Sequence, residues 1–141
     1  MNWETIPAKS KDARTYLIQD TGTNFFGLDE IVLTTKDAKA AKKQVDKIKS
    51  SLTSCKNRQP TATVSTKKVS SNGAQNIKVA GWTALVSQKS IDGTHKYRVG
   101  IVAAGSEVIY TFLNPKEEYD FSGGQWDTVA VRAGERATQI N

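Results

Sequence analysis

One histidine, one cysteine and two adjacent pairs of carboxylates are the residues of this 141-residue chain that could do chemistry. His95 comes just after Asp92-Gly93, a strong hairpin signal, so we expect an exposed histidine at a hairpin tip. Cys55 follows a predicted helix, and we interpret it as a structural thiol because the C-terminal end of a helix disfavours a thiolate. A hydrolase that uses Cys55 as its nucleophile is the alternative.

The paired carboxylates do not predict an acid–base site. Asp29 and Glu30 fall in a strand-like run, where adjacent side chains point to opposite faces of a sheet. Glu117, Glu118 and Asp120 lie in a loop without the spacing of a calcium-binding loop. One Cys and one His are too few for a structural zinc site with four such ligands. We therefore predict no catalytic residue, no metal and no cofactor.

The positive charge of the chain is concentrated in one segment. The chain has 20 Lys and Arg against 14 Asp and Glu, which gives a net charge of +6. Residues 36–58 hold eight basic and two acidic residues, so the net charge of this segment equals that of the whole chain. The simplest interpretation is a solvated helix face. The alternative is a surface for an anionic polymer, a membrane or an acidic protein, built from Lys39, Lys42, Lys43 and Lys47. With no aromatic residue and a single Arg, the segment does not predict specific nucleic-acid recognition.

Two helices are predicted from the spacing of apolar residues. The first runs from Asp37 to about Ser54, with Thr35 as its N-cap. Its apolar stripe is Ala38, Ala41, Val45, Ile48 and Leu52. The second begins near Ser122 and Gln125, which have capping-box spacing. Its stripe is Trp126, Val129, Ala130, Ala133, Ala137 and Ile140.

Six strands are predicted from runs of alternating or continuous apolar residues. These runs are residues 13–19, 25–34, 61–69, 82–91, 94–103 and 106–113, with a bulge or break expected near Gly27. Turn-forming residues separate several of them, among them residues 20–24 and 70–73. In the last two strands Tyr97, Val99 and Ile101 share a face that can continue into Val108, Tyr110 and Phe112. We expect a helix to cover that apolar side.

The order of these elements predicts an α+β fold, with a single twisted antiparallel sheet and two helices packed on it. The length suits one domain, residues 1–141, whose folded part we expect to span about residues 12–140, with residues 1–11 outside it. No run of about 18 apolar residues predicts a membrane span. The first residues do not have the basic start and apolar run of a secretory leader either.

Large aromatic residues are shared between the last strands and the second helix. They are Trp82, Tyr97, Tyr110, Phe112 and Trp126. Such a set is ordinarily part of a core. If the sheet curves away from the helices, four of these residues line a ligand pocket instead: Trp82, Tyr97, Tyr110 and Trp126.

The chain resembles the PknH-like extracellular sensor domains of actinobacterial Ser/Thr kinases and related cell-surface lipoproteins. The resemblance covers about residues 12–140 and rests on the helix that ends before Cys55, on Trp82 with the run YRVGIVAAGSEVIYTFL at 97–113, and on VAVRAGERA at 129–137. It implies a twisted sheet with helices beside it and a central cleft that binds a ligand. Members of that family commonly pair cysteines, and Cys55 departs from this pattern because it has no partner.

The resemblance implies a non-catalytic sensor or ligand-binding domain on the outside of the cell. We expect it to be monomeric, to bind a small molecule or a cell-envelope ligand, and to be tethered through a segment that this sequence does not contain. The alternative is a binding module that uses its lysine-rich helix, residues 36–58.

Overall fold

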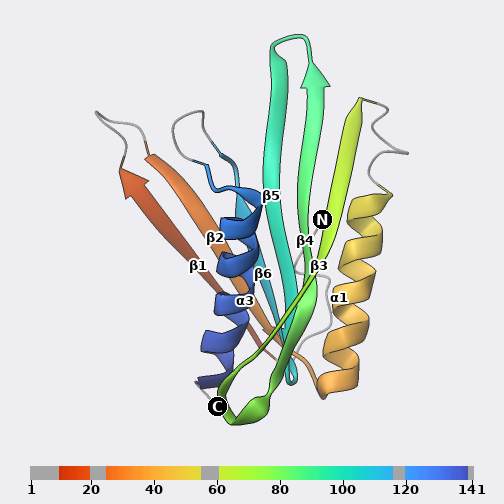
Figure 1. Cartoon of the computed structure of the whole chain (residues 1–141), viewed down its shortest axis with the longest axis vertical. Helices are drawn as coiled ribbons and strands as arrows, with labels where there is room; N and C mark the ends of the chain where they lie inside the picture. The colour runs from red at the N-terminus through yellow and green to blue at the C-terminus, as the bar shows by residue number, and fades with distance from the viewer. Residues whose placement is uncertain (1–9, 20–24, 55–60, 116–119, 140–141) are drawn as a thin grey trace.

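The structure, a computed structural model, describes residues 10–19, 25–54, 61–115 and 120–139 (Figure 1). The strands that it contains are β1 (Ser10–Gln19), β2 (Phe25–Thr34), β3 (Ala62–Asn72), β4 (Lys78–Ser90), β5 (Gly93–Ala104) and β6 (Glu107–Leu113). The helices are α1 (Ala38–Thr53) and α3 (Gly123–Gln139), with a short 3-10 turn, η2 (Ala74–Asn76), between β3 and β4. The predicted order of elements is confirmed.

All strands form one antiparallel sheet in the order β1-β2-β6-β5-β4-β3, so the predicted α+β fold is confirmed. Several strands are longer than predicted. The pairing of β3 with β4 continues to Asn72, and the chain turns only afterwards, so residues 70–72 are strand and not turn. The expected irregularity at Gly27 is also wrong, because Leu17 pairs with Gly27 in an unbroken register.

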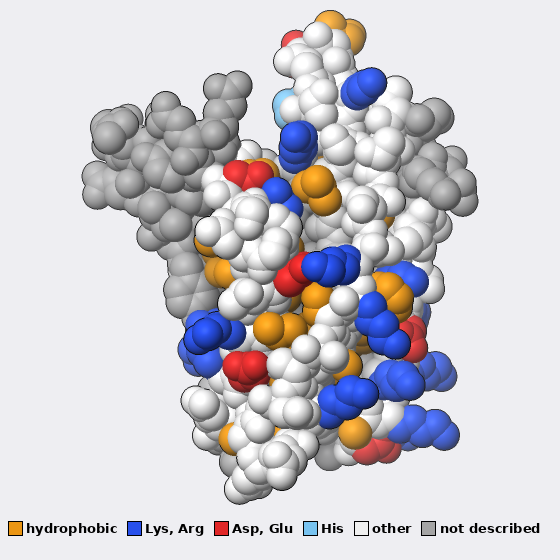
Figure 2. All heavy atoms as spheres, viewed as in Figure 1, with side chains coloured by type: hydrophobic (Ala, Val, Ile, Leu, Met, Phe, Trp, Pro, Cys, Tyr) orange, Lys and Arg blue, Asp and Glu red, His pale blue; other side chains and the backbone are white. Residues whose placement is uncertain are grey.

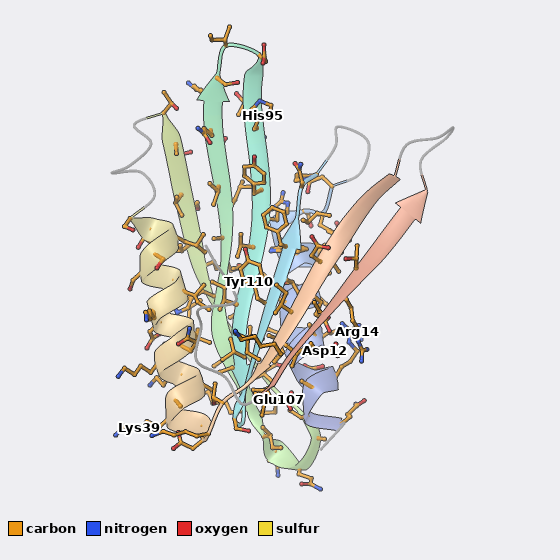
Figure 3. All side chains as sticks on the ribbon, turned by 180° about the vertical axis from the view of Figure 1, so that it is seen from behind. Asp12, Arg14, Lys39, His95, Glu107 and Tyr110 are labelled. Atoms are coloured by element: carbon orange, nitrogen blue, oxygen red, sulfur yellow. The ribbon has the colours of Figure 1, made fainter. Side chains whose placement is uncertain are left out.

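The two helices cover opposite faces of the sheet. Alternate residues of β5 divide between them: Val99 and Ile101 belong to the cluster of α1, whereas Val102 and Ala104 belong to that of α3. The two views agree, because α3 lies in front of the sheet in Figure 1 and behind it in Figure 3. The expected helix does cover the predicted apolar side, but the other side is also a core face, which the apolar pattern of the strands does not predict.

The N-cap of α1 lies two residues further along the chain than predicted. Asp37 is the N-cap, and its carboxylate accepts a hydrogen bond from the Ala40 N–H at 2.7 Å. Thr35, the predicted N-cap, is buried, and its hydroxyl lies 2.6 Å from the Ser106 carbonyl oxygen and 2.9 Å from that of Asp37. Thr35 therefore ties the start of α1 to the β5–β6 turn. The helix packs on the sheet through Ala41, Val45 and Ile48, as its stripe predicts.

Helix α3 begins with the predicted capping box. The Ser122 N–H donates to the Gln125 side chain at 2.9 Å, and the Gln125 N–H donates to the Ser122 hydroxyl at 3.2 Å. The helix approaches the sheet closely because small residues face each other at the contact. A Cβ added to Gly134 would lie 2.5 Å from a Val79 methyl group, and one added to Gly100 would lie 2.8 Å from the Ala130 Cβ.

Polar contacts lock α3 against the sheet. Arg136 donates to Glu30 at 2.8 Å, and Glu30 is only 6% exposed. Asp127 accepts from both Thr83 and Lys67 at 2.6 Å. Burying a carboxylate is unfavourable unless it is paired, so these contacts fix the position of the helix as well as stabilise it.

Candidate functional site

A cleft opens between α1 and the strands at the β3 edge of the sheet. Its volume is about 410 Å³. Helix α1 contributes Ala38, Lys42, Val45 and Asp46 to its lining, and β3 contributes Lys68. The remaining lining comes from the start of β4 and the end of β5: Ile77, Lys78, Ala80, Gly81, Trp82, Ala103 and Gly105. A cleft of this size falls within the range of small-molecule sites, about 300–1,000 Å³.

The register of the sheet explains why these residues meet. Lys68 pairs with Trp82, and Trp82 pairs with Ile101, so the three side chains lie in a row on the face that α1 covers. Ile101 is fully buried beneath the helix, whereas Trp82 is half-buried and Lys68 is exposed. The cleft therefore lies where α1 ceases to cover the sheet, between its buried stripe and the edge strand.

The connection from β3 to β4 carries Ile77 and Lys78 to the cleft. Gln75 and Asn76 adopt positive φ angles of 56° and 58°, which are unfavourable for residues with a side chain. Hydrogen bonds hold this connection: the Gly73 N–H donates to the Ile77 carbonyl at 2.8 Å, the Ile77 N–H donates to the Ala74 carbonyl at 3.1 Å, and the Ala74 N–H donates to the Thr138 hydroxyl at 2.9 Å. The connection is thus anchored to α3, on the other side of the sheet.

The structure divides the predicted lysine surface of α1 into two parts. Lys42 lines the cleft. Lys39, Lys43 and Lys47 are exposed on the outer side of the helix, and Lys39 projects away from the molecule in Figure 3. Figure 2 shows Lys and Arg side chains gathered over the part of the molecule where α1 lies. One of the four predicted lysines therefore borders the cleft, and the other three lie on the outer side of α1.

Lys49 has a separate place on the same helix. Its ammonium lies 3.8 Å from the centroid of the Trp82 ring, which is the geometry of a cation–π contact. Lys49 is half-buried. This contact fixes the indole at the border of the cleft and adds positive charge beside it.

The four predicted pocket aromatics do not come together, which corrects the sequence-based site. Trp82 lines the cleft, but Trp126 belongs to α3 and is 1% exposed on the other face of the sheet. Its indole N–H donates to the Val99 carbonyl at 3.0 Å, and it packs with Leu113 and Phe121. Trp126 is therefore a core residue, in agreement with the alternative prediction that these aromatic residues belong to the core.

Tyr97 and Tyr110 share a face with Trp82 but lie outside the lining of the cleft. Tyr97 stacks on Phe112 with ring centroids 5.6 Å apart. Tyr110 is separated from Trp82 by Ile101 in the row of paired residues, near the centre of the sheet in Figure 3. Burial, with a smaller contribution from the negative charge of Asp29, raises the pKa of Tyr110 to about 12.

The residues considered for catalysis do not assemble into a site in the described part of the chain. His95 is exposed at the end of the β4–β5 hairpin, as predicted (Figure 3). Asp29 accepts from Thr15 on the α1 face while Glu30 pairs with Arg136 on the α3 face, so their predicted separation is confirmed. Cys55, Glu117 and Glu118 lie outside the described residues. Within the described ranges, no group of three metal-ligating side chains is close enough to hold an ion.

Of the three carboxylates in the predicted acidic loop, the structure describes Asp120. Arg98 donates to both of its carboxylate oxygens, at 2.6 and 3.0 Å. These hydrogen bonds hold the pKa of Asp120 below its usual value. Asp120 therefore anchors the loop before α3 to β5 and is not directed at a ligand.

Sequence reasoning missed Lys68, Lys78 and Ala38 as cleft residues. For Lys68 a signal exists, because it follows Val64 and Thr66 in the alternation of β3 and so belongs to the helix-covered face. For Lys78 no such signal exists, because β4 was predicted to begin only at Trp82.

Comparison with protein-family models finds no match for the chain, and comparison with curated proteins finds none either. Neither described helix is long and apolar enough to cross a membrane.

Proposed function

We propose that this chain is a non-catalytic ligand-binding domain that serves as a sensor. The observation that carries this proposal is the cleft beside α1, in which a half-buried tryptophan and several lysines converge on one apolar hollow. Ligand sites typically combine such apolar walls with a few polar groups that orient the ligand. The lining residues that the structure describes are mainly apolar, with lysines that can orient a ligand, and this composition supports binding.

The contrast with the other face of the sheet supports this placement. The α3 face is filled by side chains that approach so closely that glycine is required at Gly100 and Gly134. A ligand has no room there without a rearrangement of the helix. The α1 side leaves space at the sheet edge and keeps Trp82 accessible.

The test is a ligand-observed NMR screen of a mixed fragment collection against wild-type protein and a cleft-filling variant, Ala80→Leu. Ala80 lines the cleft and is half-buried, so a larger side chain occupies the ligand volume. The matched control is Thr63→Leu, at an exposed position on the other face of β3. We expect fragments that bind wild-type protein and Thr63→Leu but not Ala80→Leu. If no fragment binds, or if binding is equal in all three proteins, the proposal is wrong.

We further propose that the domain works outside the cell, tethered through a segment that this sequence does not contain. The support is the resemblance of residues 12–140 to extracellular sensor domains. Intact-mass measurement of the protein isolated from its own cells tests this directly. A species heavier than 15.4 kDa, with further N-terminal sequence or an acyl group, is expected. A species of 15.4 kDa in the cytosolic fraction contradicts it.

A second candidate function is contact with an anionic surface through Lys39, Lys43 and Lys47. All three are exposed on the outer side of α1, and no described carboxylate forms a salt bridge with them. Such binding falls steeply between low and physiological ionic strength, because exposed charges are screened over about 8–10 Å. Sedimentation with anionic vesicles and retention on heparin at two salt concentrations measure this. Absent or salt-insensitive binding rules it out.

A further inference from the structure

The walls of the cleft are mainly apolar. Ala38 and Val45 of α1 face Ala80, Trp82 and Ala103 of the sheet, and Ile77 closes one end. An apolar body on the ligand would remove this surface from water, and the affinity would rise with each methylene group that is buried. A purely ionic ligand would gain nothing from these walls.

The charged residues of the cleft are mainly positive. Lys42, Lys68 and Lys78 line it together with one carboxylate, Asp46, so its net charge is +2. None of these three lysines forms a salt bridge with Asp46 or with another described carboxylate. They come from three different elements, α1, β3 and β4, and converge on one hollow because of the fold. Converging cations that no described carboxylate neutralises favour an anion, and they disfavour a cationic ligand.

We propose that the ligand of this cleft is a small anionic amphipath, with a phosphate monoester head held by Lys42, Lys68 and Lys78 and a short hydrocarbon body against Trp82, Val45 and Ala80. This inference rests on the proposed ligand-binding function and names its ligand class. A phosphate monoester carries about −1.5 to −2 charges at pH 7, which complements the net charge of the cleft. The volume of about 410 Å³ admits a single short chain beside the head group.

The experiment measures the affinity for octyl phosphate by isothermal titration calorimetry, below its micelle concentration. Octyl glucoside, which has the same chain and no charge, and inorganic phosphate, which has the charge and no chain, are the comparison ligands. We expect octyl phosphate to bind at least tenfold more tightly than either. The free monomer and a membrane lipid are distinguished by sedimentation with vesicles that contain phosphatidic acid, which offers the same phosphate monoester at a surface.

Two triple variants remove the same number of charges from the same molecule. Lys42→Gln/Lys68→Gln/Lys78→Gln alters the cleft, and Lys39→Gln/Lys43→Gln/Lys47→Gln alters the outer side of α1. All six positions are exposed, so both variants should remain folded, which circular dichroism checks. We expect the cleft variant to weaken octyl phosphate binding at least tenfold and the outer variant to change it less than twofold, because charges beyond the cleft are screened.

The outcomes separate this inference from the function on which it rests. If octyl glucoside binds as tightly as octyl phosphate and Ala80→Leu abolishes both, the cleft binds ligands but the anionic class is wrong. If inorganic phosphate binds as tightly as octyl phosphate, the amphipath is wrong. If only vesicles bind, and the outer variant rather than the cleft variant loses that binding, the anion site is the helix surface and this inference is overturned. If Ala80→Leu leaves all binding unchanged, the ligand-binding function of the cleft fails as well.

Discussion

The two faces of the sheet carry one helix each, but the helices are held in different ways. Helix α3 is packed through glycine and alanine, and Arg136 and Asp127 pair with groups on the sheet. Helix α1 is packed through a narrow stripe centred on Ala41, Val45 and Ile48. One charged side chain of α1, that of Lys49, contacts the sheet, through the ring of Trp82.

This difference is the basis of the proposed division of the sheet into a scaffold side and a binding side. A helix that approaches a sheet closely along its length leaves no volume for a ligand. Helix α1 covers the centre of the sheet but leaves the β3 edge, and Lys42 flanks the gap. In the proposed function, α3 fixes the sheet and the α1 side binds the ligand.

Trp82 and Trp126 lie on opposite faces of the sheet and allow a direct comparison of the two faces. Trp126 is 1% exposed and hydrogen-bonded to Val99, so Trp126→Ala should lower the free energy of unfolding by about 3–5 kcal/mol. Trp82 is half-buried at the border of the cleft, and Trp82→Ala should lower it by only about 1–2 kcal/mol. Urea denaturation followed by circular dichroism measures both. Equal losses would mean that Trp82 is core and that the two faces do not differ.

Helix α3 offers a second comparison within one element. Gly134→Leu forces a side chain against Val79 and Val102 and should destabilise the protein by about 2–3 kcal/mol. Gly124 lies in the first turn of α3 with open space around it, so Gly124→Ala should be neutral or stabilise the protein by up to about 1 kcal/mol. Thermal unfolding monitors both variants. If Gly134→Leu were tolerated, the close approach of α3 would not be required.

The α1 face should also respond to alkaline pH through Tyr110. Its pKa is raised to about 12 in the folded protein, against about 10 in the unfolded chain. The neutral phenol thus stabilises the fold fully below pH 10, and this contribution of roughly 2 kcal/mol is lost between pH 10 and 12. Tyr110→Phe should flatten the loss of stability in that range. Identical alkaline profiles for wild type and Tyr110→Phe would contradict the burial of this hydroxyl.

The ion pair of Glu30 and Arg136 should have the smallest effect. Arg136 is half in solvent, with a side chain that is 56% exposed, so Arg136→Met should destabilise the protein by about 1 kcal/mol, chiefly because Glu30 stays buried without its partner. The double variant Glu30→Gln/Arg136→Met should recover part of that loss. Arg132→Met, at an exposed position on the same helix, is the control and should change the free energy of unfolding by less than about 0.5 kcal/mol. A double variant less stable than the single one would exclude this explanation.

Local patterns sufficed to predict the elements but not the faces they cover. The spacing of Ala41, Val45 and Ile48 predicts α1, and the capping box at Ser122 predicts the start of α3, because both signals depend on neighbouring residues. The small residue Gly100 on β5 did not indicate a second core face, because its role, to let α3 approach the sheet, is visible only when α3 is placed against it. Trp126 was grouped with Trp82 because the sequence alone does not show that the two residues lie on opposite faces of the sheet.

The cleft could be predicted only in part. Trp82 and Lys42 were both singled out, but for two separate functions, an aromatic pocket and a cationic helix. Only the register that pairs Lys68 with Trp82, together with the position of α1 over β5, places them around one hollow. Such juxtapositions depend on contacts between distant segments, which periodicity in one segment does not record.

The most direct test of the division between scaffold and binding side is a titration of ¹⁵N-labelled protein with octyl phosphate, followed by amide chemical shifts. We expect progressive shifts at the amides of residues 38–46 and 77–82 and at Lys68, with α3 residues 126–137 unaffected. The same titration of Lys42→Gln/Lys68→Gln/Lys78→Gln should leave these amides in place. Shifts confined to α3, or an unperturbed spectrum of the wild-type protein, would contradict the assignment of the binding site to the α1 side of the sheet.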